Sequence, residues 1–149
     1  MPRNHFNEFV GFVRLQLATE DYDAHIPFLK QLANSMELGG SDRLLLGFLY
    51  MAYYNEASAY CAFPHVQVMR RLPPTLLPIE TQRRNFYQYG AIHKHINDLA
   101  SKGNLLDWLL QANNWDQLFE LVESLYGNGR WAAYTTSELL VHLGGFPYE

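Results

Sequence analysis

The sequence contains a single cysteine, Cys61, among 149 residues. One thiol can form neither a disulfide framework nor a cysteine metal cluster within a chain, and this usage favours a reducing, intracellular setting. We therefore expect a cytoplasmic protein in which Cys61 packs in the core as a small apolar side chain.

Long apolar runs are also lacking. A membrane-spanning helix needs roughly 18 consecutive apolar residues, and no stretch of this sequence approaches that length. The apolar residues 9–17 are interrupted by Gly11, Arg14 and Gln16 and follow no basic region. We therefore expect no signal peptide and no membrane partner.

Several motifs of known chemistry are missing from the sequence: a phosphate-binding P-loop, a dinucleotide fingerprint and a Gly-x-Ser-x-Gly nucleophile elbow. His93 and His95 have His-x-His spacing, but on a helix they point in different directions. No third ligand lies at a spacing typical of a metal site. We expect no metal and no cofactor.

Positive charge is scarce overall, and the formal net charge of −4 argues against a general nucleic-acid binder. The distribution weakens that objection, because residues 64–95 hold five basic residues against Glu80 alone: Arg70, Arg71, Arg83, Arg84 and Lys94. One face is therefore expected to be basic and to grip phosphates. The alternative is that the arginine stems cover apolar neighbours while their heads stay in water.

What the chain does have is apolar residues, 48% of the total, recurring at three- and four-residue steps without strand-like alternation. This pattern predicts an all-α fold in a single compact domain, residues 1–149, with residues 44–54 as its central buried helix. In chain order we expect these helices: residues 6–17 after Asn4; Asp21 or Asp23 to Gly39-Gly40; Ser41 to about Phe63, broken at Pro64; 65–71; Thr81 to about Lys102, ended by Gly103-Asn104; 115–126 after Asn113 or Asn114; and 130–143, ended by Gly144-Gly145. Residues 105–111 are expected to form a short segment between two of these helices.

The most distinctive stretch joins the last two predicted helices. Gly127-Asn128-Gly129 leads directly into Arg130 and Trp131. Two glycines allow positive φ and close backbone approach, and the start of the following helix attracts anions. We expect these five residues to hold a DNA phosphate, with Trp131 stacking on a nucleotide or packing as a core wedge. The alternative is a tight turn between helices.

A second polar stretch, Asn55 to Tyr60, interrupts the apolar central helix. A buried carboxylate needs a partner or a task, and burial suits Glu56 to general base work. Asn55 and Tyr60 are the expected substrate contacts. The alternative is that Glu56 lies at an exposed edge or pairs with an arginine.

The run Leu125, Gly127, Gly129 and Ala133 resembles the Leu-x-Gly-x-Gly-x-x-x-Ala motif of the helix-hairpin-helix superfamily of DNA glycosylases. The resemblance implies a DNA-glycosylase-like helical fold with a C-terminal hairpin. In that superfamily an aspartate lies about twenty residues past the first glycine, and the corresponding place here falls at or near Glu149.

A closer resemblance is to a relative of that superfamily, the bacteriophage amino acid:DNA transferases, also called α-glutamyl/putrescinyl-thymine pyrophosphorylases. It rests on residues 129–133, residues 55–64 and the pair Arg83-Arg84. It implies double-stranded DNA and an amino acid or other small amine, such as glycine, as partners. The amine attacks the methyl carbon of a phosphorylated or pyrophosphorylated 5-hydroxymethyluracil, and the (pyro)phosphate leaves. A phage enzyme of this kind would act in the host cytoplasm.

Roles follow from that reaction. The base leaves the stack, Glu56 deprotonates the amine with His65 as a substitute, and Arg83 and Arg84 stabilise the leaving group. Arg70 and Arg71 contact DNA beside the hairpin. Three other functions stay open: a glycosylase-like enzyme, a non-catalytic helical DNA-binding module, and a helical adaptor for protein partners.

Overall fold

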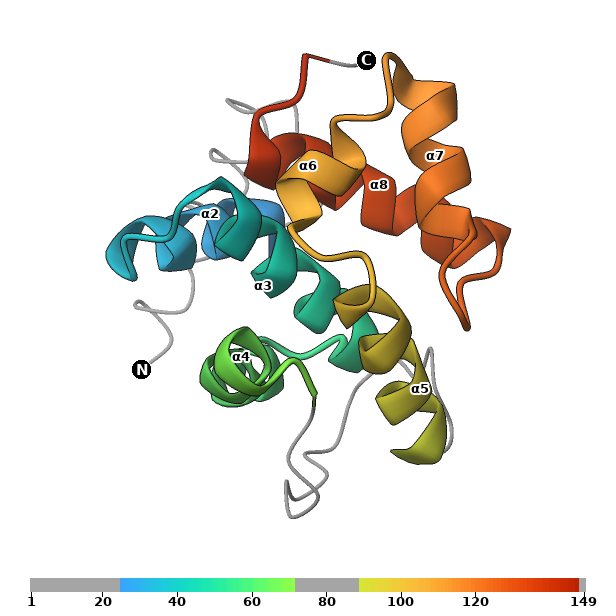
Figure 1. The fold of residues 1–149 in the computed structure, drawn as a ribbon. Coiled ribbons are helices and arrows are strands. Elements are labelled where there is room, and N and C mark those ends of the chain that lie inside the picture. Colours follow the sequence, from blue (N-terminus) through green and yellow to red (C-terminus); the bar gives the residue numbers. More distant parts are fainter. Residues whose placement is uncertain (1–24, 72–88, 148–149) are drawn as a thin grey trace, which may run out of the picture.

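The computed structural model describes residues 25–71 and 89–147, which form helices and no strands (Figure 1). The all-α fold is therefore confirmed for this part of the chain. The predicted helix over 6–17 and the expected start of a helix at Thr81 lie outside the described residues. The helices are α2 (His25–Ser35), α3 (Gly40–Tyr53), α4 (Glu56–Met69), α5 (Tyr89–Ala100), α6 (Leu105–Leu109), α7 (Trp115–Glu123) and α8 (Arg130–Gly144).

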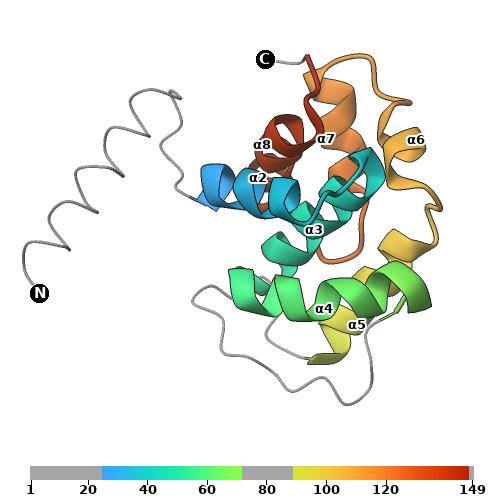
Figure 2. The same cartoon turned by 90° about the vertical axis from the view of Figure 1, so that its left-hand side faces the viewer.

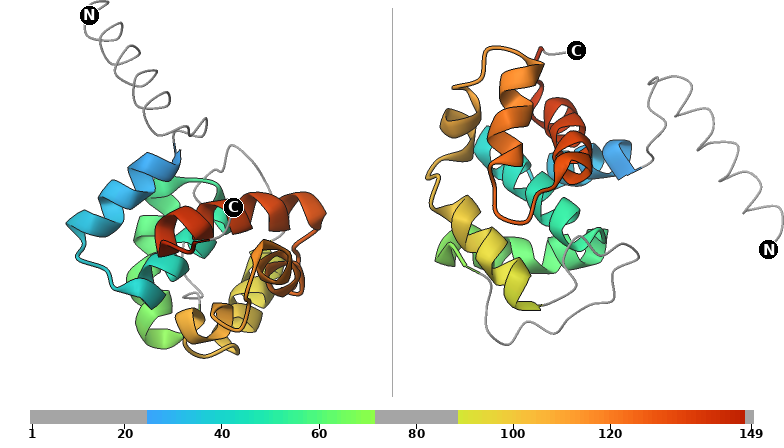
Figure 3. Two further views of the ribbon diagram at one scale, coloured as in Figure 1. Left: turned by 90° about the horizontal axis from the view of Figure 1, so that it is seen from above. Right: turned by 90° about the vertical axis from the view of Figure 1, so that its right-hand side faces the viewer.

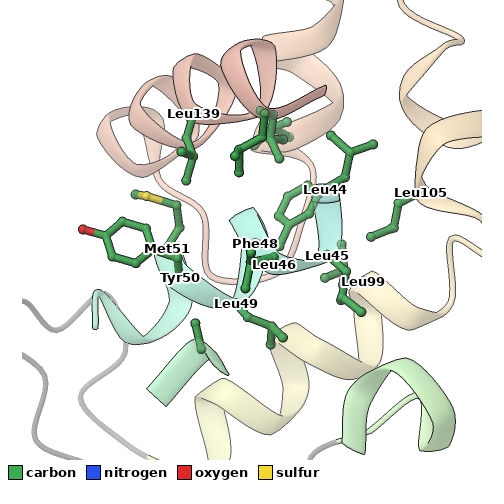
Figure 4. Close-up of a cluster of buried hydrophobic side chains, with 14 of the residues drawn as sticks. Leu44, Leu45, Leu46, Phe48, Leu49, Tyr50, Met51, Leu99, Leu105 and Leu139 are labelled. Carbon is green, nitrogen blue, oxygen red and sulfur yellow. The ribbon is translucent and has the colours of Figure 1, made fainter. Parts of the chain in front are cut away.

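Helix α3 is the central element, as its sequence predicts. It crosses the middle of the molecule between α4 and α8 (Figures 1 and 2), and these two helices make its most extensive contacts. Every residue from Leu44 to Tyr53 is buried. The close-up in Figure 4 shows the cluster that results, with Leu139 of α8 on one side of α3 and Leu99 of α5 on another.

Close packing of α3 on α8 depends on Gly47. A Cβ atom at this position would lie 2.9 Å from Cδ1 of Leu143 and 3.2 Å from Cδ2 of Leu140. Both leucines are buried, so they have little room to move. The sequence indicates close packing of the last helix at Ala132 and Ala133, but it does not indicate it at Gly47.

The boundary between α3 and α4 differs from the prediction of one helix to Phe63. Tyr54 takes a left-handed conformation with φ 52°, and Asn55 then caps α4 by accepting a 2.9 Å hydrogen bond from the Ser58 amide. Pro64 lies inside α4 rather than ending it. The inward residues Ala59 and Phe63 hold α4 in the core, which outweighs the one backbone hydrogen bond that a proline removes. The predicted short helix over 65–71 is thus the second half of α4.

Helix α2 ends earlier than predicted, before Gly39-Gly40. Glu37 adopts φ 56°, and the Leu38 amide donates to the Ala33 carbonyl at 3.0 Å, which closes the helix by a Schellman motif. Gly39, not Ser41, is then the N-cap of α3. The Ser41 hydroxyl instead accepts a 3.2 Å hydrogen bond from the Leu105 amide and ties α6 to α3.

The C-terminal elements agree with the prediction at Asn114, which caps α7, and at Gly145, which ends α8 with φ 68°. The segment predicted over 105–111 contains a short helix, α6, which Asn104 caps. Helix α7 ends at Glu123, three residues before the predicted Tyr126. Helices α7 and α8 pack against each other and are joined by the turn visible in Figure 3. In the described part of the chain, no helix has the length and apolar character that crossing a bilayer requires.

Candidate nucleic-acid interface

The turn between α7 and α8 covers residues 124–129 and will be called the hairpin. Gly127 has φ 84°, a left-handed conformation that favours glycine. Gly129 has φ −78° and ψ 177°, so it is extended and serves as the N-cap of α8. Of the two glycines that allow positive φ, only Gly127 therefore uses it. Asn128 turns its side chain inward, and its Nδ2 donates to the Val122 carbonyl at 3.0 Å.

Two residues of α5 hold the hairpin at Tyr126. Oδ2 of Asp98 accepts a 2.8 Å hydrogen bond from the Tyr126 amide, and Nδ1 of His95 donates to the Tyr126 carbonyl at 2.7 Å. Lys94 places its Nζ 5.8 Å from the centre of the Tyr126 ring. Because the amide and the carbonyl of Tyr126 both form hydrogen bonds with α5, the hairpin is attached to α5 as well as to α7 and α8.

His95 is the buried member of this contact, with 2% of its surface exposed. Burial lowers the pKa of His95 below its ordinary value, against the opposing effects of the Tyr126 hydrogen bond and the negative charge of Asp98. The neutral ring must carry its proton on Nδ1, since the Tyr126 carbonyl can only accept. His95 therefore has a structural task at the hairpin.

Helix α8 begins at the protein surface without a side-chain cap among the described residues. By contrast, α4, α6 and α7 are each capped by an asparagine side chain. Arg130 is exposed at the first position of α8, and Trp131 is 51% exposed at the second. A Cβ atom on Gly129 would meet no described atom within 4 Å, so the fold of the described residues does not itself demand a glycine there.

A pocket of about 400 Å³ lies beside this helix start, between α7 and α8; we call it the hairpin pocket. The ring of Trp115 meets that of Tyr134 edge-on, with 5.9 Å between centroids. The lining combines four aromatic rings with one cation and one carboxylate: Trp115, Asp116, Phe119, Arg130, Trp131 and Tyr134. Stacking surface and charge thus occur at the same place.

Glu56 lies elsewhere, at the first position of α4 beside a groove of about 600 Å³ between α2 and α4, the α2–α4 groove. Its Oε1 is in hydrogen-bond contact with Nδ1 of His25, and 30% of its side chain is exposed. Its partner among the described residues is therefore a histidine, and its side chain is only partly buried. The groove is lined by Phe28, Leu32, Asn55, Glu56, Ala57 and Tyr60.

No family model, curated protein or solved structure matches this chain. A function must therefore be inferred from its own residues and contacts.

The structure brings only some of the predicted site residues together. Gly127 and Gly129 lie in the hairpin, and Arg130 and Trp131 follow it directly at the start of α8. Asn55, Glu56 and Tyr60 share the α2–α4 groove, but no residue lines both pockets in the described part of the chain. Asn55 also has a structural task, because its Oδ1 accepts from the Ser58 hydroxyl as well as its amide.

The other predicted residues lie apart from both pockets or outside the described residues. His65 is exposed on α4, and Arg70 and Arg71 are exposed where α4 ends. Arg70 shares a small pocket with Ile96 and Ala100 of α5, and neither of the α5 residues that hold the hairpin lines that pocket. Arg83, Arg84 and Glu149 are outside the described residues. Cys61 is exposed, so its expected place in the core was wrong. It falls on the side of α4 opposite Ala59 and Phe63.

Sequence reasoning missed several residues that shape these sites. His25 meets Glu56 across 31 positions, and no local pattern signals such a contact. His95 does carry a signal, since it continues the buried stripe of Ile92, Ile96 and Leu99. Trp115 and Phe119 form an aromatic pair at helical spacing on α7, and Tyr134 lies one turn after the predicted Trp131 on α8.

Proposed function

We propose that this protein binds double-stranded DNA through the hairpin and transfers a small amine onto a phosphorylated or pyrophosphorylated 5-hydroxymethyluracil in it. One observation carries the DNA binding: α8 begins at the surface, with exposed Arg130 at its first turn and no cap among the described side chains. The start of a helix favours an anion. Arginine can bind a phosphate through two parallel hydrogen bonds.

The reaction itself is a displacement at a saturated carbon. The amine nitrogen forms a bond to the methylene carbon on C5 of the uracil, and the bond from that carbon to the phosphate oxygen breaks. The (pyro)phosphate takes the electron pair, while the amine proton passes to a base on the protein. No oxidant or cofactor is needed, because the leaving group is already activated.

The α2–α4 groove supports the chemical part of the proposal. Glu56 is the carboxylate that lines this groove and would accept the amine proton, and the His25 imidazole is in contact with it. Asn55 and Tyr60 line the same groove, where Tyr60 offers a half-exposed ring to a base. The arginines expected to stabilise the leaving group are Arg83 and Arg84.

Binding is tested with Arg130→Ala. We expect weaker binding of about equal size on DNA of any sequence and a salt dependence with a slope smaller by about one, because one phosphate contact is lost. Fluorescence anisotropy across a salt series measures both. Lys30→Ala, an exposed cation on α2, is the matched control and should leave both unchanged. An unchanged salt slope in Arg130→Ala would remove the hairpin from DNA binding.

Chemistry is tested by mass spectrometry of nucleosides from DNA carrying phosphorylated 5-hydroxymethyluracil, after incubation with the protein and each amine. We expect a base heavier by the amine and lighter by the phosphate, and no such product with Glu56→Gln, whose DNA affinity persists. Abasic sites would instead indicate a glycosylase-like enzyme. Full activity of Glu56→Gln would exclude Glu56 as the base.

A second function, a non-catalytic DNA-binding module, is favoured by one observation: among the described residues, none lines both the hairpin pocket and the α2–α4 groove. This function needs only the hairpin. It predicts salt-dependent DNA binding with no change in the mass of any nucleoside.

A further inference from the structure

The hairpin pocket contains more aromatic surface than a phosphate contact needs. Trp131 and Tyr134 are 51% and 53% exposed, whereas Trp108 of α6 is 8% exposed. Two large aromatic rings that are half exposed beside a pocket of about 400 Å³ form a surface typical of a binding site. Trp115 and Phe119 complete the lining from the neighbouring helix.

The charged groups at the rim define what fits. Arg130 lies at the first position of α8, where a phosphate is favoured, and also lines the pocket. Asp116 lines the same pocket and can accept a hydrogen bond from a ring N–H. A ligand with a flat ring, an N–H edge and an attached phosphate matches all three features.

We infer that the hairpin pocket accepts one unstacked nucleobase of the DNA strand whose phosphate lies at Arg130. Trp131 and Tyr134 provide the stacking surface, and Asp116 faces the N–H edge of a thymine or guanine. This inference rests on the DNA binding in the proposed function, and it is independent of the chemistry assigned to Glu56.

A simple cation is the competing ligand, because aromatic rings with a carboxylate also bind quaternary ammonium groups. Arg130 argues against it, since a cation in this pocket would have a second positive charge at its rim. A phosphate-bearing base gains from Arg130 instead. The cation is therefore treated as an outcome of the test.

The experiment compares three short duplexes of one sequence at one salt concentration: fully paired, with one bulged thymine, and with one bulged abasic residue. We expect the thymine bulge to bind on the order of tenfold more tightly than the other two, since stacking of one base on an aromatic ring is worth that much or more. It should also quench tryptophan fluorescence, because Trp115 and Trp131 line the pocket.

Variants assign the effect to the pocket. Trp131→Ala should bind all three duplexes alike, while Trp131→Phe keeps most of the preference because a ring remains. Leu110→Ala, which removes a side chain that is 54% exposed and does not line the hairpin pocket, is the matched control and should keep the whole preference. Far-ultraviolet circular dichroism checks that each variant is folded.

Four results would overturn the inference. Equal affinity for the paired and thymine-bulged duplexes would do so while leaving hairpin binding to DNA intact. Equal affinity for the thymine and abasic bulges would show that a bend, not a base, is recognised. Quenching by tetramethylammonium but by no DNA would assign the pocket to a cation. Failure to bind even the paired duplex would remove the proposed function itself.

Discussion

At the scale of single residues, Gly47 sets how near α8 can lie to α3. Replacing it by alanine puts a Cβ atom 2.9 Å from Leu143 and 3.2 Å from Leu140 in a buried contact. We expect Gly47→Ala to lower the free energy of unfolding by about 1–3 kcal/mol, measured by urea denaturation. Helix propensity alone has the opposite sign, since alanine is favoured over glycine by about 1 kcal/mol inside a helix.

The control for Gly47 uses its own neighbour. Leu143→Ala alone leaves a cavity and should also destabilise, but it removes the atom nearest to the new methyl group. The double variant should therefore be less destabilised than the sum of the two single changes, by about 1 kcal/mol. Simple additivity, or a stabilising Gly47→Ala, would contradict close packing at this point.

At the scale of elements, the contact between His95 of α5 and the hairpin makes the free energy of unfolding depend on pH. Burial lowers the pKa of His95, so below pH 6.5 the unfolded chain binds a proton that the folded chain resists. The free energy of unfolding should fall as the pH is lowered from 7 through 6.5 and down to the folded-state pKa. One proton contributes at most about 1.4 kcal/mol per pH unit.

The variant His95→Asn isolates this effect. Its Nδ2 can still donate to the Tyr126 carbonyl, which Nδ1 of His95 does now, but the side chain no longer titrates. Denaturation between pH 5 and 8 should show a shallower slope than in the natural chain. The other histidines contribute to both proteins alike, so identical slopes would mean that His95 does not control this dependence.

Element boundaries were predictable where a side chain makes the boundary. Asn114 was predictable as the cap of α7, and its side-chain oxygen accepts a hydrogen bond from the amide three residues later. Asn104 caps α6 in the same way, although it was predicted only as the end of the preceding helix. The same rule applies to Asn55, but the apolar run across it suggested one helix to Pro64. The end of α2 at Ser35 was not predictable, since it depends on the left-handed conformation of Glu37, which is not a glycine.

At the scale of the whole molecule, the all-α fold and the central place of residues 44–53 followed from apolar spacing, which is a local property. The sites did not follow in the same way. The contact of His25 with Glu56 and the contacts of α5 with Tyr126 join residues about 30 positions apart. Spacing along one helix carries no information on which helices meet. The turn between α7 and α8 was predictable because all its residues are consecutive in the sequence.

Under the proposed function, the separation of the two pockets determines how two substitutions combine in their effect on DNA affinity. Arg130 lines the hairpin pocket and Tyr60 lines the α2–α4 groove, and the two pockets have no lining residue in common in the described part of the chain. Contacts without shared partners add in free energy to within about 0.5 kcal/mol. The factors by which Arg130→Ala and Tyr60→Ala weaken binding should therefore multiply in the double variant to within about twofold.

Four dissociation constants on one duplex carrying phosphorylated 5-hydroxymethyluracil test this expectation, with Lys30→Ala paired with Tyr60→Ala as the control. If the double variant binds DNA much more tightly than the product of the two single-variant factors predicts, the two residues act on one shared contact. In that case the DNA would have to bring the groove and the hairpin into a single site. If Arg130→Ala weakens binding and Tyr60→Ala leaves it unchanged, DNA contact is restricted to the hairpin, because Tyr60 then contributes no contact with the duplex.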